Sequence, residues 1–244
     1  MTRKKTGQIT LHRENTVFTA GYCFFRAELP ELLAGVPLLH PEERAYFETL
    51  KFDRRKTSYL LGRMAAKHAV AELMGEADLR SIWIDTGVFR FPVVKYAGGQ
   101  NIQVSISHCG TLGVALAFSE MHPLGVDLEH IDEGRLPVLA TQITDEEKQI
   151  LAALGLPETV GFTLLWTIKE GVSKTLRTGL TMDFKILTVK SMKWAGNTIE
   201  TAYRASSQYK AFSCYDKDHV LSFILPRKTK VDLGGFWEAF GEMG

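Results

Sequence analysis

The order of the expected secondary structure repeats along this chain, because a helical segment followed by several short strands occurs twice. In the first occurrence, a 3.6-residue apolar period predicts a helix over residues 41–75, from Pro41 to Gly75. Apolar runs then predict strands at 81–85, 104–107, 112–118 and 124–129. In the second occurrence, helices are predicted at 144–154 and 162–178, the latter ending at Gly179, and strands at 184–189, 198–203, 211–215 and 220–224.

This order predicts an α+β fold of two similar halves, each with a helix packed on an antiparallel sheet, related by pseudo-twofold symmetry. The chain of 244 residues is long enough for both halves to have a core. A hinge expected near residues 119–123 gives an N-terminal half of residues 1–121 and a C-terminal half of residues 122–244. We see no convincing residue identity between the halves. Two internal halves make a monomer sufficient.

Composition narrows the class of protein. The net charge of +1 and the lack of a basic stripe weigh against nucleic acid as a partner. The three cysteines are widely spaced with no CxxC pair, which argues against a disulfide framework or a zinc finger and fits a reducing compartment. No stretch approaches the ~20 apolar residues of a membrane span, and no apolar segment of a leader follows the basic start of the chain. We therefore expect a cytoplasmic protein without a membrane partner.

Two carboxylates lie close together in the strand-like segment "LGVDLEHI". Asp127 and Glu129 are two residues apart, so their side chains share one face of a strand. Like charges side by side repel, and burial would raise the cost. A bound divalent cation would remove this repulsion. The alternative is a strand of alternating polarity whose charged face is exposed to solvent.

The segment "WTIKEGVSK" is expected to be helical, which brings Trp166, Glu170 and Lys174 to one face. With Glu170 as a third acid, Asp127 and Glu129 would form an incomplete oxygen shell of the kind that suits Mg²⁺. The alternative is an amphipathic helix with a surface Glu–Lys pair worth only ~0.3–0.5 kcal/mol. Gly171 costs about 1 kcal/mol in a helix interior, which close packing or a nearby ligand would explain.

A third segment, "SISHCG", ends a strand at a turn and brings Ser107 and His108 to its edge. By itself, His108 could be a hydrogen-bonded turn residue. Cys109 could be a nucleophile, but apart from His108 nothing nearby would stabilise a thiolate.

The order and spacing of these three segments, across roughly residues 40–190, resemble the 4′-phosphopantetheinyl transferases of the long, two-half, surfactin-synthetase-activating type. That family has a G-[IV]-D-[IL]-E strand, here residues 125–129, and about forty residues later W-x-x-K-E-[ASG]-x-x-K, here residues 166–174. An S-[IL]-S-H segment lies upstream, here residues 105–108. The element between them, F-[TS]-x-x-E, is present as residues 143–147 with Ile143 in place of the aromatic residue.

The resemblance implies transfer of phosphopantetheine from coenzyme A to a serine of an acyl or peptidyl carrier protein, with adenosine 3′,5′-bisphosphate released. Carriers of fatty-acid, polyketide and peptide synthetases are all compatible with it. The ligands of Mg²⁺ would be Asp127, Glu129 and Glu170. Glu170 would also be the base for the serine hydroxyl, and Lys174 would bind coenzyme A and stabilise or protonate the leaving phosphate. The other coenzyme A contacts would come from Arg55, Arg63, Ser107, His108 and Lys169.

One departure from the family pattern concerns the coenzyme A contact. Relatives have a G-[KQ]-P turn before the S-[IL]-S-H strand, whereas this chain has "FRFPVV" with Phe91 before Pro92. The usual lysine contact is therefore missing or supplied by Arg90 or Lys95. This leaves two alternatives open: a catalytically weak homologue that binds coenzyme A or carrier proteins, and another Mg²⁺-dependent phosphoryl transferase.

Overall fold

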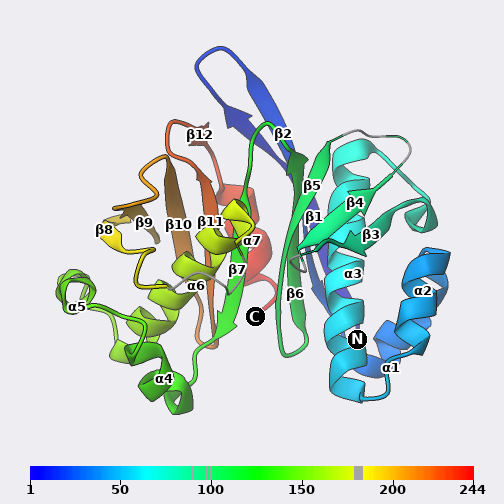
Figure 1. Cartoon of the computed structure of the whole chain (residues 1–244), viewed down its shortest axis with the longest axis horizontal. Coiled ribbons are helices and arrows are strands. Elements are labelled where there is room, and N and C mark those ends of the chain that lie inside the picture. Colours follow the sequence, from blue (N-terminus) through cyan, green and yellow to red (C-terminus); the bar gives the residue numbers. More distant parts are fainter. Residues whose placement is uncertain (89–90, 97, 99–100, 179–183) are drawn as a thin grey trace. The chain divides into compact units, whose positions relative to one another are not determined.

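The computed structural model describes residues 1–244 except 89–90, 97, 99–100 and 179–183. Two compact units emerge (Figure 1). The N-terminal unit comprises Met1–Pro123 and Thr229–Met243, and the C-terminal unit comprises Leu124–Lys228. The predicted boundary at 121/122 assigned residues 229–243 to the second half, whereas the structure packs them with the first. Among the described residues, no helix combines the length and apolarity needed to cross a membrane.

The N-terminal unit is built on a five-stranded antiparallel sheet with strand order β12-β1-β2-β6-β5. Its strands are β1 Arg3–His12, β2 Val17–Arg26, β5 Ile102–Cys109, β6 Leu112–Ser119 and β12 Lys230–Val231. The hairpin of β3 Trp83–Thr86 and β4 Pro92–Lys95 is separate. The helices are α1 Leu29–Ala34, α2 Pro41–Glu48, α3 Asp53–Met74 and α7 Gly234–Gly241, with 3₁₀ turns η1 Val36–Leu38 and η2 Leu79–Ser81.

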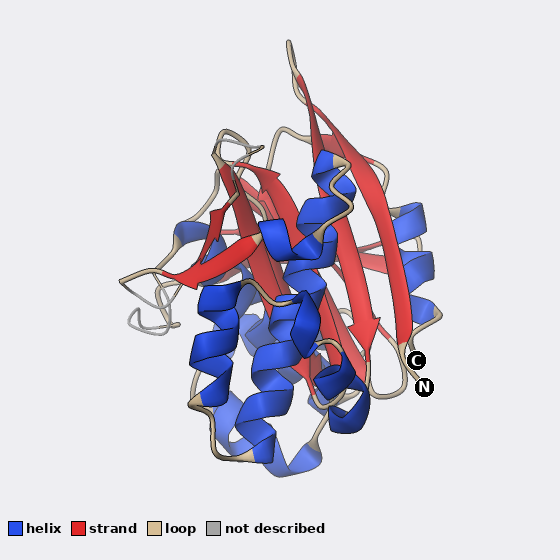
Figure 2. Ribbon diagram, turned by 90° about the vertical axis from the view of Figure 1, so that its right-hand side faces the viewer, coloured by secondary structure: helices blue, strands red, loops and turns tan. Residues whose placement is uncertain are grey.

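Helix α3 provides most of the helical contribution to the core of the N-terminal unit. Leu60, Leu61 and Ala65 are among its fully buried residues. Helix α7 contributes the rings of Phe236 and Phe240, whose centroids lie 5.0 Å and 6.0 Å from that of Phe24 on β2. This aromatic contact fixes the chain's last helix to the hairpin formed by its first two strands, which projects beyond the neighbouring strands (Figures 1 and 2).

The C-terminal unit has a five-stranded antiparallel sheet with strand order β7-β11-β10-β9-β8. Its strands are β7 Gly125–His130, β8 Val189–Ala195, β9 Thr198–Tyr203, β10 Tyr209–Tyr215 and β11 His219–Pro226. Its helices are α4 Leu136–Ala140, α5 Asp145–Ala152 and α6 Glu158–Leu176, and the 3₁₀ turn η3 is Glu133–Arg135. Helix α6 buries Leu165, Ile168 and Val172 in the core. The predicted α+β class with two sheet-containing halves is therefore confirmed.

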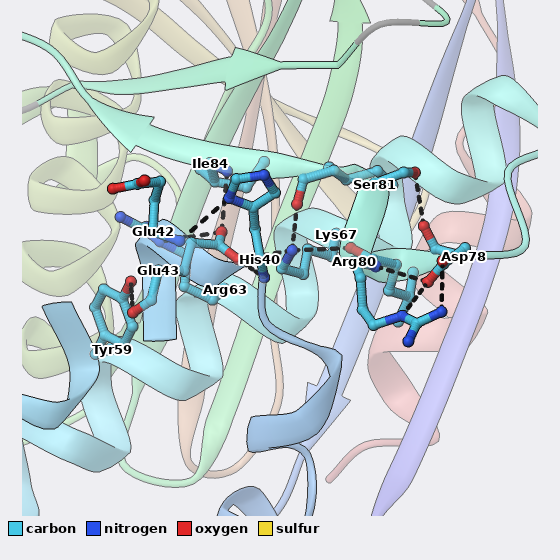
Figure 3. Close-up of polar contacts among 12 residues, drawn as sticks. His40, Glu42, Glu43, Tyr59, Arg63, Lys67, Asp78, Arg80, Ser81 and Ile84 are labelled. Carbon is cyan, nitrogen blue, oxygen red and sulfur yellow. Dashed lines mark hydrogen bonds and ion pairs between the residues drawn. The ribbon is translucent and has the colours of Figure 1, made fainter. Parts of the chain in front are cut away.

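A buried carboxylate joins three elements of the N-terminal unit (Figure 3). Glu43 on α2 accepts hydrogen bonds from the backbone N–H of His40, at 2.9 Å, and from that of Ile84 on β3, at 2.9 Å. Its Oε2 atom lies 2.7 Å from the Nζ atom of Lys67 on α3, and both side chains are buried. The Glu43 carboxylate thus caps the N-terminus of α2 and links α2 to helix α3 and strand β3.

The C-terminal unit contains the same arrangement. Glu147 on α5 accepts from the N–H of Thr144 at 3.0 Å and from the N–H of Val189 on β8 at 3.1 Å. Its Oε2 atom lies 2.8 Å from the Nζ atom of Lys169 on α6. Glu147 thus links the N-terminus of α5 to strand β8 and helix α6, as Glu43 links the N-terminus of α2 to β3 and α3. The repeat predicted from element order therefore extends to equivalent contacts in each unit.

Two predicted elements differ from the structure. Residues 41–75 form two helices, α2 and α3. The chain is not helical at 49–52, and no glycine or proline in that stretch marks the break in the sequence. Residues 184–188 are not the start of a strand but a turn closed by Leu187 N–H on Phe184 O, and β8 begins at Val189. The stretch is apolar because Phe184 and Leu187, which are three residues apart, are both buried in the core. Strands β1, β2 and β4 and helix α7 were not predicted, and Gly179 lies outside the described residues.

Candidate functional site

Strand β7 carries two of the three predicted acids, Asp127 and Glu129. Asp127 is opposite Ser222 on β11 and is 2% exposed, whereas the side chain of Glu129 is 21% exposed. The alternative of a charged strand face in solvent therefore does not hold for Asp127. A buried carboxylate requires a compensating partner.

Helix α6 supplies that partner and faces β7 with the predicted side chains. The Nζ atom of Lys174 lies 2.6 Å from Asp127 Oδ1, and Trp166 Nε1 donates to Glu129 Oε1 at 3.2 Å. Lys174 is therefore bound to the strand, which a surface Glu–Lys pair, the alternative considered from the sequence, does not describe. Asp127, Glu129 and Glu170 are called the acid cluster below.

Glu170 is the third member of the acid cluster, and its electrostatic environment couples it to the other two. Burial raises the pKa of its carboxyl to about 7, and the negative charges of Asp127 and Glu129 act in the same direction. Lys174 and Arg135 oppose the rise. A carboxyl with this pKa can accept a proton at neutral pH and still be partly protonated, which suits a general base.

We expect the Glu170→Gln variant to change the pH dependence of stability. Because the pKa of Glu170 is raised in the folded state from 4.5 to about 7, its contribution to stability is complete below about pH 4.5 and is lost as the pH rises through about 7. Glutamine cannot ionise. The free energy of unfolding of the variant relative to the native protein should therefore rise by about 1–2 kcal/mol between pH 5 and pH 8, discounted for partial exposure. Denaturant titrations with EDTA measure this, and a pH-independent difference would contradict it.

A residue that was not predicted completes the surroundings of Glu129. Arg135 Nη1, on η3, lies 2.5 Å from Glu129 Oε2. Two side-chain cations thus contact the acid cluster, Lys174 at Asp127 and Arg135 at Glu129. In the part of the chain that the structure describes, no group of three or more His, Cys, Asp or Glu side chains is arranged to hold a metal ion. The metal role of the acid cluster stays a prediction.

Lys169 is also on α6, but its ammonium contacts Glu147 and Gln142 and not strand β7. It is 1% exposed, and its Nζ atom lies 2.8 Å from both Glu147 Oε2 and the carbonyl oxygen of Gln142. The structure therefore places this predicted coenzyme A residue in a buried ion pair with Glu147. In this arrangement it stabilises the fold of the unit.

Two glycines set the distance between α6 and β7. A Cβ atom at Gly171 would collide with the side chain of Ile224, and one at Gly125 would collide with the carbonyl oxygen of Gly171. Close packing therefore accounts for the glycine in the helix interior. Only such an approach allows side chains as short as Asp127 to reach α6.

The N-terminal unit contains the same helix–strand contact without the acids. A Cβ atom at Gly21 on β2 would collide with the carbonyl oxygen of Ala69 on α3. This matches the C-terminal unit, where a Cβ atom at Gly125 would collide with the carbonyl oxygen of Gly171. Aligning Gly21 with Gly125, and Ala69 with Gly171, identifies the residues of the N-terminal unit that are equivalent to the acid cluster. Asp127 corresponds to Cys23, Glu129 to Phe25, and Glu170 to His68. The rings of Phe25 and His68 are stacked with centroids 5.8 Å apart. An apolar stack thus replaces the acid cluster in this half of the repeat.

The predicted arginines line a cavity of the N-terminal unit. The cavity has a volume of about 430 Å³, and its lining includes Arg55, Arg63, Tyr59 and Trp83 together with the acids Glu42, Glu43 and Asp85. Arg63 lies 4.7 Å from the Tyr59 ring centroid and 3.7 Å from Glu43 Oε1. Its Nε atom is buried and makes no hydrogen bond to the described residues. Glu43 therefore offsets part of the positive charge that Arg63 brings to the cavity.

Ser107 and His108 lie near the end of β5, before the turn at Gly110, as predicted. His108 is exposed and its Nε2 atom lies 2.9 Å from Ser58 Oγ on α3, whereas Ser107 is 7% exposed. A hydrogen-bonded histidine at a turn, the alternative considered from the sequence, describes this geometry. His108 thus belongs to the α3 side of the sheet.

The departure from the family pattern lies in the hairpin of β3 and β4. Lys95 Nζ lies 2.6 Å from Asp85 Oδ2 and 4.0 Å from the centroid of the Trp83 ring. One candidate to replace the family's lysine is therefore held by an acid and an aromatic ring. The other, Arg90, lies outside the described residues.

Sequence reasoning missed Arg135 and the Glu43–Lys67 pair. Arg135 follows Glu129 by six residues, beyond the strand, so no period relates the two. Glu43 stands three residues after His40, which is the first residue of a capping box but not one of the residue types usual there. For Glu147, Thr144 three residues earlier is a usual first residue of a capping box, but this local signal gives no indication of a long-range partner.

Comparisons with known proteins show which family and relatives the chain is similar to. Residues 123–224, which contain the whole acid cluster, match the family model of the 4′-phosphopantetheinyl transferase superfamily. The chain is 35% identical over 137 residues to enterobactin synthase component D of Salmonella typhimurium, covering 53% of this chain and 51% of that protein. It is 36% identical over 123 residues to the protein of that name from Escherichia coli K12, covering 50% and 54%. The chain thus spans about half the length of the curated relatives it matches.

Proposed function

Because residues 123–224 belong to the 4′-phosphopantetheinyl transferase superfamily, we propose that this chain transfers 4′-phosphopantetheine from coenzyme A to a serine of a carrier protein. Adenosine 3′,5′-bisphosphate is the other product. The observation that carries the proposal is the side-by-side placement of β7 and α6 with Lys174 on Asp127 and Trp166 on Glu129. The relatives' name, component D of a synthase, supports a carrier domain of a biosynthetic synthase as the acceptor.

The acid cluster supports a requirement for Mg²⁺ by its donor chemistry. Three carboxylates provide hard oxygen ligands. Burial is the main cause that raises the pKa of Glu170 to about 7, and the negative charge of Asp127 and Glu129, which a cation would compensate, adds to it. Asp127, Glu129 and Glu170 would hold the ion. When bound, Mg²⁺ neutralises diphosphate charge and polarises phosphorus.

The remaining roles follow from the side chains themselves. Glu170, directly or through a water, would take the proton of the serine hydroxyl, because its pKa of about 7 leaves a large basic fraction at neutral pH. Lys174, held at the acid cluster by Asp127, would stabilise or protonate the leaving phosphate. The oxygen–phosphorus bond to the carrier forms as the bond to the adenosine bisphosphate leaving group breaks.

The cavity of the N-terminal unit supports binding of the charged nucleotide portion of coenzyme A. Arg55 and Arg63 provide positive charge, and Tyr59 and Trp83 provide aromatic surface. We assign phosphate contacts in this unit to the two arginines and to Ser107 and His108. For Lys169 the buried pair with Glu147 supports a structural role in place of a direct contact.

Mass spectrometry tests the proposal directly. The protein is incubated with coenzyme A, Mg²⁺ and an apo carrier protein, and the carrier should gain about 340 Da, our estimate for a phosphopantetheine group delivered by phosphoryl transfer. A carrier whose serine is replaced by alanine is the control. No gain of mass on any peptide, polyketide or fatty-acid carrier would contradict the proposal.

Arg63→Ala is expected to raise the KM for coenzyme A by about 10-fold or more, because a charge-assisted contact to phosphate is lost. The kcat for the carrier should change less. Arg54→Ala on the exposed side of α3 is the matched control. A defect confined to the KM for the carrier protein would contradict the assignment of Arg63 to coenzyme A.

A further inference from the structure

We propose that Arg135 is an internal counter-ion of the acid cluster. Its guanidinium binds the Glu129 carboxylate when no divalent cation is bound and leaves that carboxylate when one binds. The inference depends on the proposed function, because it assumes that the acid cluster takes a divalent cation. It adds a residue outside the motifs that define the family.

Both carboxylate oxygens of Glu129 already have a donor. Trp166 Nε1 donates to Oε1 at 3.2 Å, and Arg135 Nη1 lies 2.5 Å from Oε2. The guanidinium of Arg135 also lies 5.9 Å from the centroid of the Trp166 ring. A divalent ion on Oε2 would therefore meet a positive charge at short range, and the two cations compete for the same oxygen.

The surroundings of the two donors indicate which one gives way. Trp166 is neutral, belongs to the long helix α6 and packs against Phe184, with ring centroids 4.9 Å apart. Arg135 ends the three-residue turn η3, and its side chain is 37% exposed. Its charge can move into water at little cost, because partly exposed ion pairs contribute only ~0–1 kcal/mol. The indole then keeps Glu129 in place while the arginine leaves.

Direct measurement of metal binding tests this inference without an activity assay. Isothermal titration of the full chain with Mn²⁺, in the absence of coenzyme A, should show about 3- to 10-fold tighter binding by Arg135→Gln than by the native protein. Arg135→Lys keeps the positive charge and should bind Mn²⁺ with an affinity close to the native one. Arg204→Gln removes an exposed arginine paired with Glu146 in the same unit and should change nothing.

The outcomes separate this inference from the proposed function. Equal or weaker Mn²⁺ binding by Arg135→Gln, with binding abolished in Asp127→Asn, would overturn the counter-ion role and leave the metal site in place. Weaker binding in particular would make Arg135 a positioning residue that supports Glu129 in the metal-bound state. Absence of Mn²⁺ binding by the native protein would overturn the inference together with the metal requirement. Thermal unfolding of each variant verifies that the fold is retained.

Discussion

Asp127→Asn is expected to lower kcat/KM for phosphopantetheine transfer by about 10³-fold or more. The substitution keeps the shape of a 2% exposed side chain and an oxygen acceptor for Lys174 Nζ, which lies 2.6 Å away. It removes the charge that a divalent cation and the lysine both require. Initial rates with coenzyme A, Mg²⁺ and a carrier protein measure the loss. Asp145→Asn, which changes an exposed acid paired with Lys148, is the control.

A second measurement distinguishes this effect from a damaged fold. The charge of Asp127 is the largest cause, after burial, of the raised pKa of Glu170. In Asp127→Asn that pKa should fall from about 7 towards its ordinary value, and the pH at which stability is lost should fall with it. Turnover close to that of the native protein would remove Asp127 from the metal site. An unchanged pH profile of stability would show that the two carboxyls are not coupled.

The sequence could predict the acid cluster because local periods relate its members to their elements. The two-residue period places Asp127 and Glu129 on one strand face, and the helical period places Trp166, Glu170 and Lys174 on one helix face. Neither period indicates that this strand face and this helix face lie against each other. Their meeting was expected from the family resemblance, and in the structure the glycines Gly125 and Gly171 make it physically possible.

The parts that the sequence did not predict depend on long-range contacts. Strands β1 and β2 alternate little, because α3 and α7 pack on their two faces and Cys23 and Phe24 are both fully buried. The family resemblance implied a coenzyme A contact for Lys169. The structure places its ammonium on Glu147, 22 residues earlier on another helix. A one-dimensional motif does not specify whether its lysine faces a ligand or the core.

The repeat of the two units also became visible only in three dimensions. Glu43 and Glu147 bind equivalent donors, although the residues that begin their capping boxes, His40 and Thr144, differ. The equivalent of the acid cluster in the N-terminal unit is a cysteine and two stacked rings, so comparison of the two halves by residue identity finds nothing there.

Lys169→Met is expected to lower the free energy of unfolding by about 3–5 kcal/mol, because it leaves the carboxylate of Glu147 buried without its cation. Both side chains are nearly inaccessible, at 1% and 0% exposed. For a chain of this length the melting temperature should fall by about 6–20 °C. Differential scanning calorimetry measures this, and Lys148→Met, at an exposed lysine on α5, is the matched control and should have little effect.

A second substitution identifies the cause of that loss. Glu147→Gln in the Lys169→Met background removes the uncompensated charge. Its single amide oxygen keeps an acceptor for one of the two N–H groups, of Thr144 or of Val189, that donate to different oxygens of Glu147, so only part of the stability should return. Lys67→Met should destabilise the other unit in the same way, because Glu43 then loses its cation. If Lys169 instead contacts coenzyme A, Lys169→Met would raise the KM for coenzyme A at an unchanged melting temperature. That result would show that the buried pair is not the reason for the lysine in this motif.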